Sequence, residues 1–286
     1  MNTVPSPRRW LITGANSGLG AAFTRAALAA GDVVVAAVRR PGAMAEVADE
    51  HPDRVTVVEL DVRDPAACRR VVETSGRIDV LVNNAGYGIV GAIEETTEEE
   101  VRDAFEVMFH APLRLTRLVL RQMRERRSGA IIQVSSMGGL LSFAGAGAYC
   151  AAKGALEQAS EALAAEVGPL GINVVILEPG AFRTGFAGSA LRQSTPIPGY
   201  EDTVGPIRTS LAASHGNEPG DPDKAARALL NTLDLPEPPL RLALGEDAIS
   251  AIRAKLKAVA ADLDATADLA RHTAVASQDP LIGGIL

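Results

Sequence analysis

Short apolar runs alternate with longer amphipathic runs along most of the chain. The short runs are rich in Val and Ile, and they occupy residues 9–13, 32–38, 54–60, 78–82, 129–135 and 172–178. Gly, Asp, Pro or Asn bounds each of them, and the Ala-rich stretches between them have helical periodicity. Unbroken apolar strands that alternate with helices are typical of a parallel sheet covered on both faces. The pattern therefore predicts an α/β fold with a doubly wound, Rossmann-type sheet.

The length of the chain fits one such domain over residues 1–286, because α/β folds often exceed the usual domain size. Residues 185–222 are rich in Gly, Pro, Ser and Thr, and we expect them to fold over the site as a substrate lid. Residues 97–127 have the pattern of a helix that starts with a capping box, Thr97-Glu98-Glu99-Glu100. Residues 246–261 have the pattern of an amphipathic helix. We expect 262–286 to form a C-terminal tail.

Composition argues against several classes of protein. Acidic residues outnumber basic ones, 35 to 28, which is the reverse of what a nucleic-acid-binding surface needs. Residues 1–9 lack the apolar core of a signal peptide, and no run approaches the roughly 20 apolar residues of a membrane span. Cys68 and Cys150 are too few for a disulfide framework and have no zinc-ligand spacing. We therefore expect a cytoplasmic protein with no nucleic-acid, membrane or metal partner.

A glycine-rich turn follows the first strand and opens the first helix. Glycines at this junction permit a tight turn, let the backbone approach a pyrophosphate, and direct the N-terminal amides of the helix toward it. Such a turn alone is weak evidence for a dinucleotide site, since many matches are ordinary loops. The contacts expected from it are Gly14, Asn16, Ser17, Gly18, Leu19 and Gly20.

Further motifs follow in a fixed order and fall at the ends of the later strands. They are Asn83-Asn84-Ala85-Gly86, Ser136, Tyr149, Lys153 and Pro179-Gly180. Ligands of a doubly wound sheet bind at the carboxyl ends of its strands, so these motifs predict one shared site. At these spacings, residues 8–245 resemble the short-chain dehydrogenase/reductase family, in its simple branch and nearest to hydroxysteroid- and retinol-dehydrogenase-like members. The resemblance implies hydride transfer between a nicotinamide cofactor and a carbonyl or alcohol.

The expected acid–base group is Tyr149. Lys153 lies four residues later, so the two side chains share one face of a helix. An ammonium about 4 Å from the phenol, at an effective dielectric of ~20, would favour phenolate by roughly 4 kcal/mol, or about three pK units. We therefore expect the pKa of Tyr149 to lie near neutral pH, where proton transfer is most efficient.

Two further positions complete the expected catalytic group. Ser136, which the resemblance favours over Ser135, would hydrogen-bond the substrate oxygen. Met108 stands where members of the family carry an asparagine that holds a water near the lysine, largely through its main-chain carbonyl. Pro112 has no N–H to pair with the Met108 carbonyl in an α-helix, so we expect the relay to survive through the main chain. His110 is read as a packed or surface residue.

The end of the second strand bears on cofactor choice. An NAD site places an acid there for the ribose 2′-hydroxyl, but Ala37 stands near that position and Arg39 and Arg40 follow. A guanidinium binds a 2′-phosphate in a bidentate manner, so NADP(H) is favoured over NAD(H). Either arginine could be the one involved, and both could instead belong to a basic turn.

The resemblance implies further cofactor contacts. Asp61, with Val62 beside it, would contact the adenine, although an acid in the first turn of a helix explains Asp61 equally well. The remaining contacts that it implies are Asn83, Ala85, Gly86, Tyr149, Lys153, Pro179, Gly180 and Thr184, with Lys153 at the nicotinamide ribose hydroxyls.

These observations favour an NADP(H)-dependent enzyme that interconverts an alcohol and a carbonyl, with a substrate that is apolar because the lid carries few charges. A catalytically weak, redox-sensing regulator of the same fold is the alternative, and Met108 is the feature that supports it. A sugar-nucleotide epimerase also uses Tyr-x-x-x-Lys, but the glycine spacing and the modest C-terminal part disfavour it. A homodimer or homotetramer is expected through the small residues of 151–165, although packing within one chain would give the same pattern.

Overall fold

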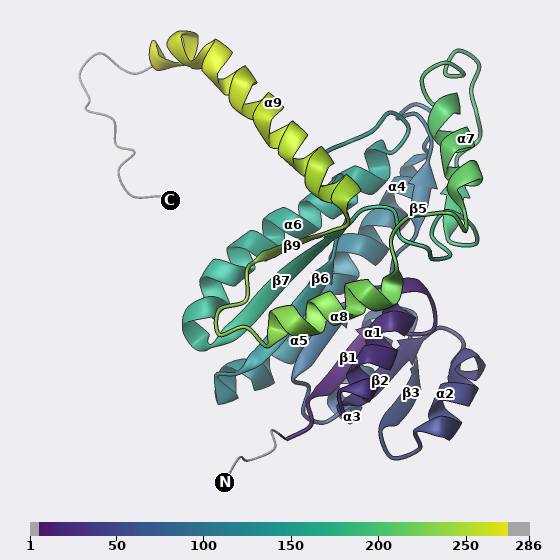
Figure 1. The fold of residues 1–286 in the computed structure, drawn as a ribbon, viewed down its shortest axis with the longest axis vertical. Helices are drawn as coiled ribbons and strands as arrows, with labels where there is room; N and C mark the ends of the chain where they lie inside the picture. The colour runs from purple at the N-terminus through teal and green to yellow at the C-terminus, as the bar shows by residue number, and fades with distance from the viewer. Residues whose placement is uncertain (1–5, 274–286) are drawn as a thin grey trace.

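A computed structural model describes residues 6–273, and it contains a sheet of seven parallel strands in the order β3-β2-β1-β4-β6-β7-β9 (Figure 1). The strands are β1 (Arg9–Thr13), β2 (Val33–Val38), β3 (Val55–Glu59), β4 (Val80–Asn83), β6 (Gly129–Val134), β7 (Ile172–Pro179) and β9 (Arg241–Leu244). The parallel sheet and the doubly wound fold are therefore confirmed. The strand order reverses between β1 and β4, which is where a Rossmann-type sheet opens a ligand crevice.

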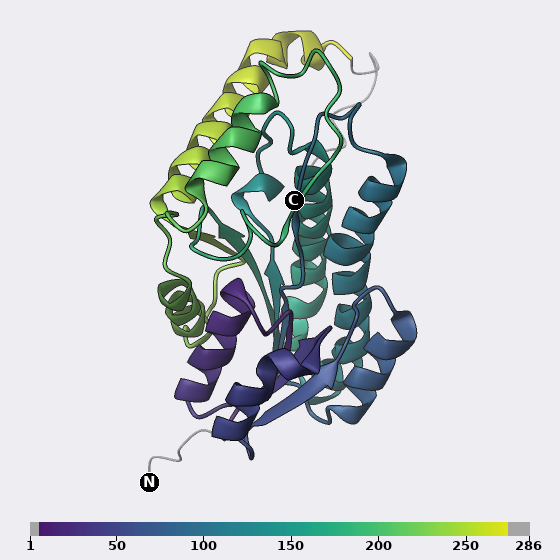
Figure 2. The same ribbon diagram turned by 90° about the vertical axis from the view of Figure 1, so that its right-hand side faces the viewer.

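Helices cover both faces of the sheet, as Figure 2 shows. They are α1 (Gly18–Ala29), α2 (Ala45–Glu50), α3 (Pro65–Thr74), α4 (Glu98–Phe105), α5 (Ala111–Arg126), α6 (Gly147–Val167), α7 (Gly205–Ser214), α8 (Pro222–Leu233) and α9 (Glu246–Arg271). Alternate residues of β1 pack against the helices on opposite faces of the sheet. Trp10 and Ile12 pack with Phe23 of α1, whereas Leu11 packs with Leu115 of α5. Burial on both sides explains why the strands are apolar throughout.

Three short strands were not expected from the sequence. They are β9, at the edge of the main sheet, and β5 (Gly88–Val90) and β8 (Leu191–Gln193), which pair with each other in parallel. Each has only three or four residues, too few for a periodic pattern to stand out. The expected lid therefore holds a strand, β8, and a helix, α7, rather than being irregular throughout. Val204 of this segment is buried against Val90 and Ala92.

The helix expected over 97–127 is divided in the structure. Its start agrees with the sequence, because Thr97 and Glu100 form a capping box. The main chain then widens into a π-helix over Glu106–His110 before α5 begins. This change directly precedes Pro112, which cannot donate an i→i−4 hydrogen bond.

The C-terminal region differs from the expectation. The sequence pattern predicted a helix that ends at residue 261, but α9 continues to Arg271. Residues 262–271 are therefore helical rather than part of a tail. In Figure 1, α9 runs outward from the end of β9 and beyond the sheet. Residues 274–286, the rest of the expected tail, lie outside the described residues, as do residues 1–5.

Candidate active site

Tyr149 and Lys153 lie on one face of α6, beside the carboxyl end of β6. The Nζ atom of Lys153 is 5.9 Å from the centre of the Tyr149 ring, and it donates a hydrogen bond to the carbonyl of Val134 at 2.6 Å. Ser136 begins the short 3₁₀ turn η3 (Met137–Gly139), where its Oγ accepts the Gly138 N–H at 3.0 Å. The structure thus brings the expected acid–base tyrosine, its lysine and the serine together.

Ser135 and Ser136 point in different directions. The Ser135 hydroxyl is buried and donates to Oε1 of Glu157 at 2.5 Å. Ser136 is half-buried. It lies near Tyr149, because a Cβ placed on Gly138 would be 3.4 Å from both Ser136 Oγ and Tyr149 Cε1. Ser136 is therefore the serine that can face a reacting oxygen.

The pKa of Tyr149 departs from the expectation. Burial raises the pKa of the phenol well above its usual value near 10, although the Ser136 hydroxyl opposes the shift. Burial also lowers the pKa of Lys153 to about 8, against a smaller opposing effect of Glu157. The expected lowering of the tyrosine pKa is therefore not found. Burial of the phenol is the main cause, and the Lys153 ammonium donates its hydrogen bond to the Val134 carbonyl.

Met108 lies in the π-helix and is fully buried, in a cluster with Tyr87 and Ile89. A Cβ placed on Gly86 would be 3.6 Å from Met108 Cγ and 3.7 Å from Lys153 Nζ. Met108 therefore packs beside the lysine, as the sequence count suggested. The π-helix at this point supports the idea that the main chain has an altered hydrogen-bonding pattern here, because such bulges are frequent at functional sites.

The glycine-rich turn has the geometry that a phosphate cradle requires. Gly14 and Gly18 have φ values of 65° and 52°, in the left-handed region. A Cβ on Gly20 would lie 2.2 Å from the Gly14 carbonyl oxygen, so only glycine lets α1 start this close to β1. Asn16 and Ser17 are exposed on the turn, and Leu19 packs against the core.

The Asn83-Asn84-Ala85-Gly86 segment is divided between two roles. The Asn83 side chain is buried among the Pro112 carbonyl, Thr116 and Gln133, on the α5 side of the sheet, so its amide lies away from the glycine-rich turn. Asn84, which was not expected to contribute, donates to the Thr13 carbonyl at 2.8 Å. Asn83 ends β4 and Asn84 is the first residue after it, so the path of the chain at the strand end decides which amide faces the turn.

The Thr13 hydroxyl joins β1 to the segment after β4. It accepts the Asn84 and Ala85 N–H groups at 2.9 and 3.0 Å. This contact sets the position of Ala85 and Gly86 next to the glycine-rich turn.

The segment after β7 closes the other side of the turn. Thr184 lies against Gly18, because a Cβ on that glycine would be 3.3 Å from Thr184 Cβ. Asp247, at the start of α9, accepts the Ala181 N–H at 2.7 Å and fills the space beside Gly180. Asp247 thereby holds the Pro179-Gly180 turn in place. No local pattern could mark Asp247, because it is 67 positions from Gly180 along the chain.

Arg39 and Arg40 are exposed just beyond β2. The Gly14 N–H donates to the Ala37 carbonyl at 2.9 Å, so this strand end adjoins the glycine-rich turn. Ala37 is itself buried, and no acid occupies its place. The position after β2 therefore offers cations and no carboxylate.

Asp61 and Val62 follow β3. Arg63 holds the Asp61 carboxylate with its main-chain N–H at 3.0 Å and with Nη2 at 2.6 Å. These hydrogen bonds lower the pKa of Asp61, and the charge of Arg39 adds to the effect. Val62 is buried, and its carbonyl accepts a hydrogen bond from Arg114 at 3.0 Å.

Two residues of 185–222, the segment expected to act as a lid, contact side chains of the candidate site or the loop after Gly86. The Phe186 ring meets the Tyr149 ring edge-on, with 5.5 Å between centres. On β8, the Arg192 guanidinium lies 3.8 Å above the Tyr87 ring and pairs with Asp103 at 2.6 Å. The lid is thus fastened to the loop after Gly86 by a cation–π contact and an ion pair.

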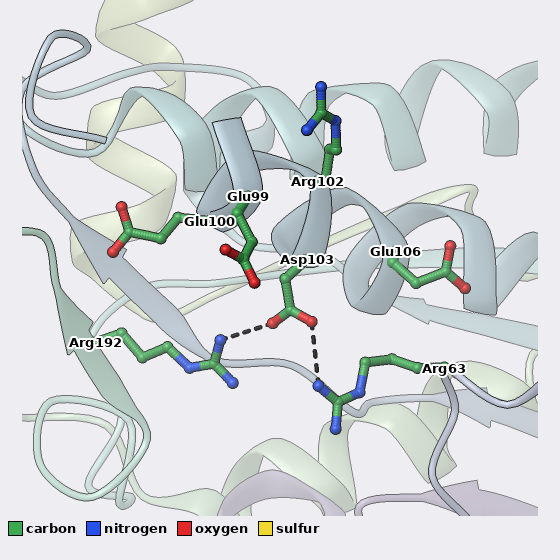
Figure 3. A pocket seen from close by; sticks show the side chains of 7 residues that line it. All are labelled: Arg63, Glu99, Glu100, Arg102, Asp103, Glu106 and Arg192. Carbon is green, nitrogen blue, oxygen red and sulfur yellow. Dashed lines mark hydrogen bonds and ion pairs between the residues drawn. The ribbon is translucent and has the colours of Figure 1, made fainter. Parts of the chain in front are cut away.

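Asp103 of α4 lies between two arginines (Figure 3), pairing with Arg192 on one side and with Arg63 at 3.2 Å on the other. A chain of ion pairs thereby links Asp61 to the lid strand, along a hollow of about 520 Å³. Its members are widely separated in sequence, so no local pattern could have revealed them.

Residues 6–273 contain neither a membrane-spanning helix nor a metal-binding cluster. No helix there combines the length and the hydropathy that crossing a bilayer demands. In the same residues no three His, Cys, Asp or Glu side chains gather closely enough to coordinate a metal ion.

Comparison with known proteins identifies the family. The family model described as short chain dehydrogenase matches residues 8–195. This range includes all the motifs from the glycine-rich turn to Thr184. The chain belongs to the short-chain dehydrogenase/reductase family. The motifs that suggested this resemblance are the ones that the fold gathers at the strand ends.

Several characterised or named members of the short-chain dehydrogenase/reductase family are similar over most of their length. Oxidoreductase BOA17 of Botryotinia fuckeliana is 39% identical over 84% of this chain and 89% of its own. The 3-ketodihydrosphingosine reductase of Bacteroides thetaiotaomicron is 36% identical over 84% and 88%. Human retinol dehydrogenase 8 is 33% identical over 82% and 81%.

Solved structures of family members agree with the fold. A short-chain dehydrogenase from Streptomyces avermitilis is 48% identical, covers 95% of this chain and all of its own, and has a TM-score of 0.90. Serine dehydrogenase complexed with NADP+ is 26% identical over 82% of this chain and 94% of its own, with a TM-score of 0.72. A member from Burkholderia phymatum in complex with NAD shares the fold, at 22% identity and a TM-score of 0.76, covering 86% and 92%. The protein is accordingly an oxidoreductase of a fold that holds nicotinamide cofactors.

Proposed function

We propose that this protein is an NADP(H)-dependent oxidoreductase that interconverts a carbonyl and a secondary or primary alcohol. The observation that carries the proposal is the convergence of Ser136, Tyr149 and Lys153 with the glycine-rich turn and Thr184 at the carboxyl ends of β1, β6 and β7. No single motif carries this weight, since each is common by itself.

The residues present fit a dinucleotide. Gly14 and Gly18 adopt left-handed conformations and Gly20 lets the N-terminus of α1 pack close to the Gly14 carbonyl, which leaves backbone amides without side chains where a pyrophosphate would bind. Beside it, Arg39 and Arg40 are the exposed cations that would hold a 2′-phosphate. Lys153 and Thr184 would bind the nicotinamide half. When bound, the cofactor supplies the hydride, and the protein supplies position and electrostatics.

Tyr149 is the proposed acid–base group. Because burial raises the pKa of its phenol, the side chain is protonated at neutral pH and is ready to give a proton to a carbonyl oxygen. Ser136 would donate a hydrogen bond to the same oxygen. Lys153, held at the end of β6 by the Val134 carbonyl, places its positive charge beside the phenol ring and stabilises the phenolate left after transfer.

The substrate is proposed to be apolar. Phe186 lies against Tyr149, and the exposed Ile93 lies beside the start of α6, where a Cβ on Gly147 would be 3.3 Å from its Cγ1. Two relatives named above are a 3-ketodihydrosphingosine reductase and a retinol dehydrogenase, and this supports an apolar substrate. We also propose a cytoplasmic location, which the two free, buried cysteines support because reduced thiols persist there.

The test combines cofactor binding with turnover. NADPH and NADH are titrated by fluorescence, and then a panel of apolar ketones and aldehydes is added while oxidation of the reduced cofactor is followed. We expect Tyr149→Phe to lower kcat by at least about 10²-fold, the usual contribution of general acid catalysis, without changing the Kd of NADPH. Tyr200→Phe removes a phenol that donates to Glu94, and it serves as the matched control.

Two outcomes would contradict the proposal. Turnover that survives in Tyr149→Phe would remove the acid–base role. Tight NADPH binding with no carbonyl reduced would favour the alternative, a redox-sensing regulator of the same fold in which Met108 packs beside Lys153.

A further inference from the structure

Helix α9 leaves the body of the protein after its first two turns. Ala248 and Ile252 are buried, and Asp247 is bonded to the Ala181 N–H, so the start of the helix is firmly attached. Every residue from 253 to 266 is then exposed. A helical stretch of fourteen exposed residues is marginal in water, because most helical stability in proteins comes from packing one face.

The exposed part of α9 nevertheless has an apolar face. Leu256, Val259 and Leu263 are 56%, 47% and 67% exposed and continue the line of the buried Ile252. The spacing from 252 is four, three and four residues, the 3–4 repeat of a coiled-coil seam. At 3.6 residues per turn, the three exposed side chains fall within an arc of roughly 60°. This seam of Leu256, Val259 and Leu263 is an unpartnered face within residues 6–273.

The charges beside the seam are divided between its two ends. Lys255 and Lys257 lie toward the start of the helix, whereas Asp262 and Asp264 lie toward its end. In a parallel pair of such helices, like charges would lie side by side. In an antiparallel pair, the lysines of one copy lie alongside the aspartates of the other, and the leucines of the two seams interdigitate. The helix is thus complementary to itself in one orientation only.

We propose that α9 pairs with α9 of a second copy of this chain in an antiparallel two-helix contact. The pairing is isologous, since the same face serves both subunits and each lysine–aspartate contact occurs twice. It is separate from the contact expected through the small residues of α6, so the two together would link subunits into a larger assembly. The proposal does not depend on the proposed reaction.

The test uses the full chain and measures mass in solution by light scattering and sedimentation over a range of concentrations. Leu256→Ser combined with Leu263→Ser is expected to weaken the association at least tenfold, while cofactor binding and thermal unfolding of the body stay the same. Leu269→Ser is the matched control, because Leu269 is 78% exposed but lies roughly 110° away from the seam.

Charge reversal tests whether the charges beside the seam contribute to the association, and the response to salt tests the orientation. Lys255→Glu with Lys257→Glu makes the whole seam acidic, and Asp262→Lys with Asp264→Lys makes it basic. Each double variant should lose the association, and an equimolar mixture should regain it. Salt should weaken the association of the unmodified protein, whereas a parallel pair would be strengthened by screening.

Three results would overturn the proposal. The first is that Leu256→Ser combined with Leu263→Ser has the same mass in solution as the unmodified protein. The second is an association that salt strengthens. The third is a mixture of the two charge variants that does not associate. If the seam leucines instead protect residues 274–286 from proteolysis without changing the mass, the occupant is the chain's own C-terminal segment.

Discussion

Glu157 and Ser135 form a hydrogen bond of 2.5 Å behind the reaction site, with Glu157 completely buried one helical turn after Lys153. The other carboxylate oxygen of Glu157 accepts from Arg241 at 2.6 Å. Arg241 also bonds to the buried Glu178 and to Glu161. One arginine on an edge strand thus neutralises two buried acids between α6 and β7.

Removing Arg241 should therefore destabilise the fold strongly. Arg241→Met leaves Glu157 and Glu178 buried without their cation, and the loss of one partner from a buried pair costs about 3–5 kcal/mol. Urea-induced unfolding measures the change. Glu161→Gln is the control, because Glu161 is 44% exposed and its pair should contribute about 1 kcal/mol or less. Equal effects of the two substitutions would contradict this account.

The rate of carbonyl reduction should fall as pH rises through about 8. The buried Lys153 has its pKa lowered to about 8, so its ammonium is present below that pH and is lost above it. The pKa of Tyr149 is raised, so the phenol keeps its proton over the same range. The measurement is kcat/KM against pH.

Glu157→Gln provides the matched test of that assignment. The negative charge of Glu157 raises the pKa of Lys153, in opposition to burial. Its removal should move the falling limb to lower pH. A limb that stays in place, or a profile that remains flat to pH 10, would show that Lys153 does not control it.

Cofactor preference should depend on one of the two arginines after β2. Arg39→Ala should raise the KM for NADPH about 10- to 100-fold, because a hydrogen bond to a charged group contributes roughly 1.5–3 kcal/mol. The KM for NADH should change little. Arg40→Ala is compared under the same conditions, and the larger effect identifies the arginine that binds the phosphate. If neither variant changes the ratio of the two KM values, the NADP(H) proposal fails.

Met108→Asn should not improve the enzyme. Met108 is fully buried among apolar side chains, so an amide there loses packing and needs new hydrogen-bond partners, at a cost of about 1–3 kcal/mol. We expect a lower Tm and a kcat within a few-fold of the unmodified protein, because the proposed relay uses the main chain. A kcat raised by orders of magnitude would mean that the missing amide limits turnover.

Much of the site could be read from the chain because its local geometry is set by residue type. Gly14, Gly18 and Gly20 had to be glycines for backbone reasons, and the capping box at Thr97 is local as well. The four-residue spacing of Tyr149 and Lys153 places both on one face of any helix. The apolar runs likewise predicted six of the seven strands of the sheet, β1, β2, β3, β4, β6 and β7.

Electrostatic and long-range features were not readable in this way. The expected drop in the pKa of Tyr149 assumed a distance of about 4 Å to the ammonium, whereas the fold buries the phenol and directs Lys153 to the Val134 carbonyl. Asn83 and Asn84 are neighbours in sequence, but only the path of the chain at the end of β4 decides which one faces the glycine-rich turn.

The sequence by itself determined the order of six sheet strands and their helices, the tight glycine-rich turn and the placing of Tyr149 and Lys153 on one helix face, because these depend on periodicity and on contacts within a few residues. Only the tertiary structure decided the burial of Tyr149, the Glu157–Arg241–Glu178 cluster, the support of the Pro179-Gly180 turn by Asp247 and the exposed seam of α9. Each of these depends on which distant segments come together and on how much water they exclude, and no local pattern encodes either quantity.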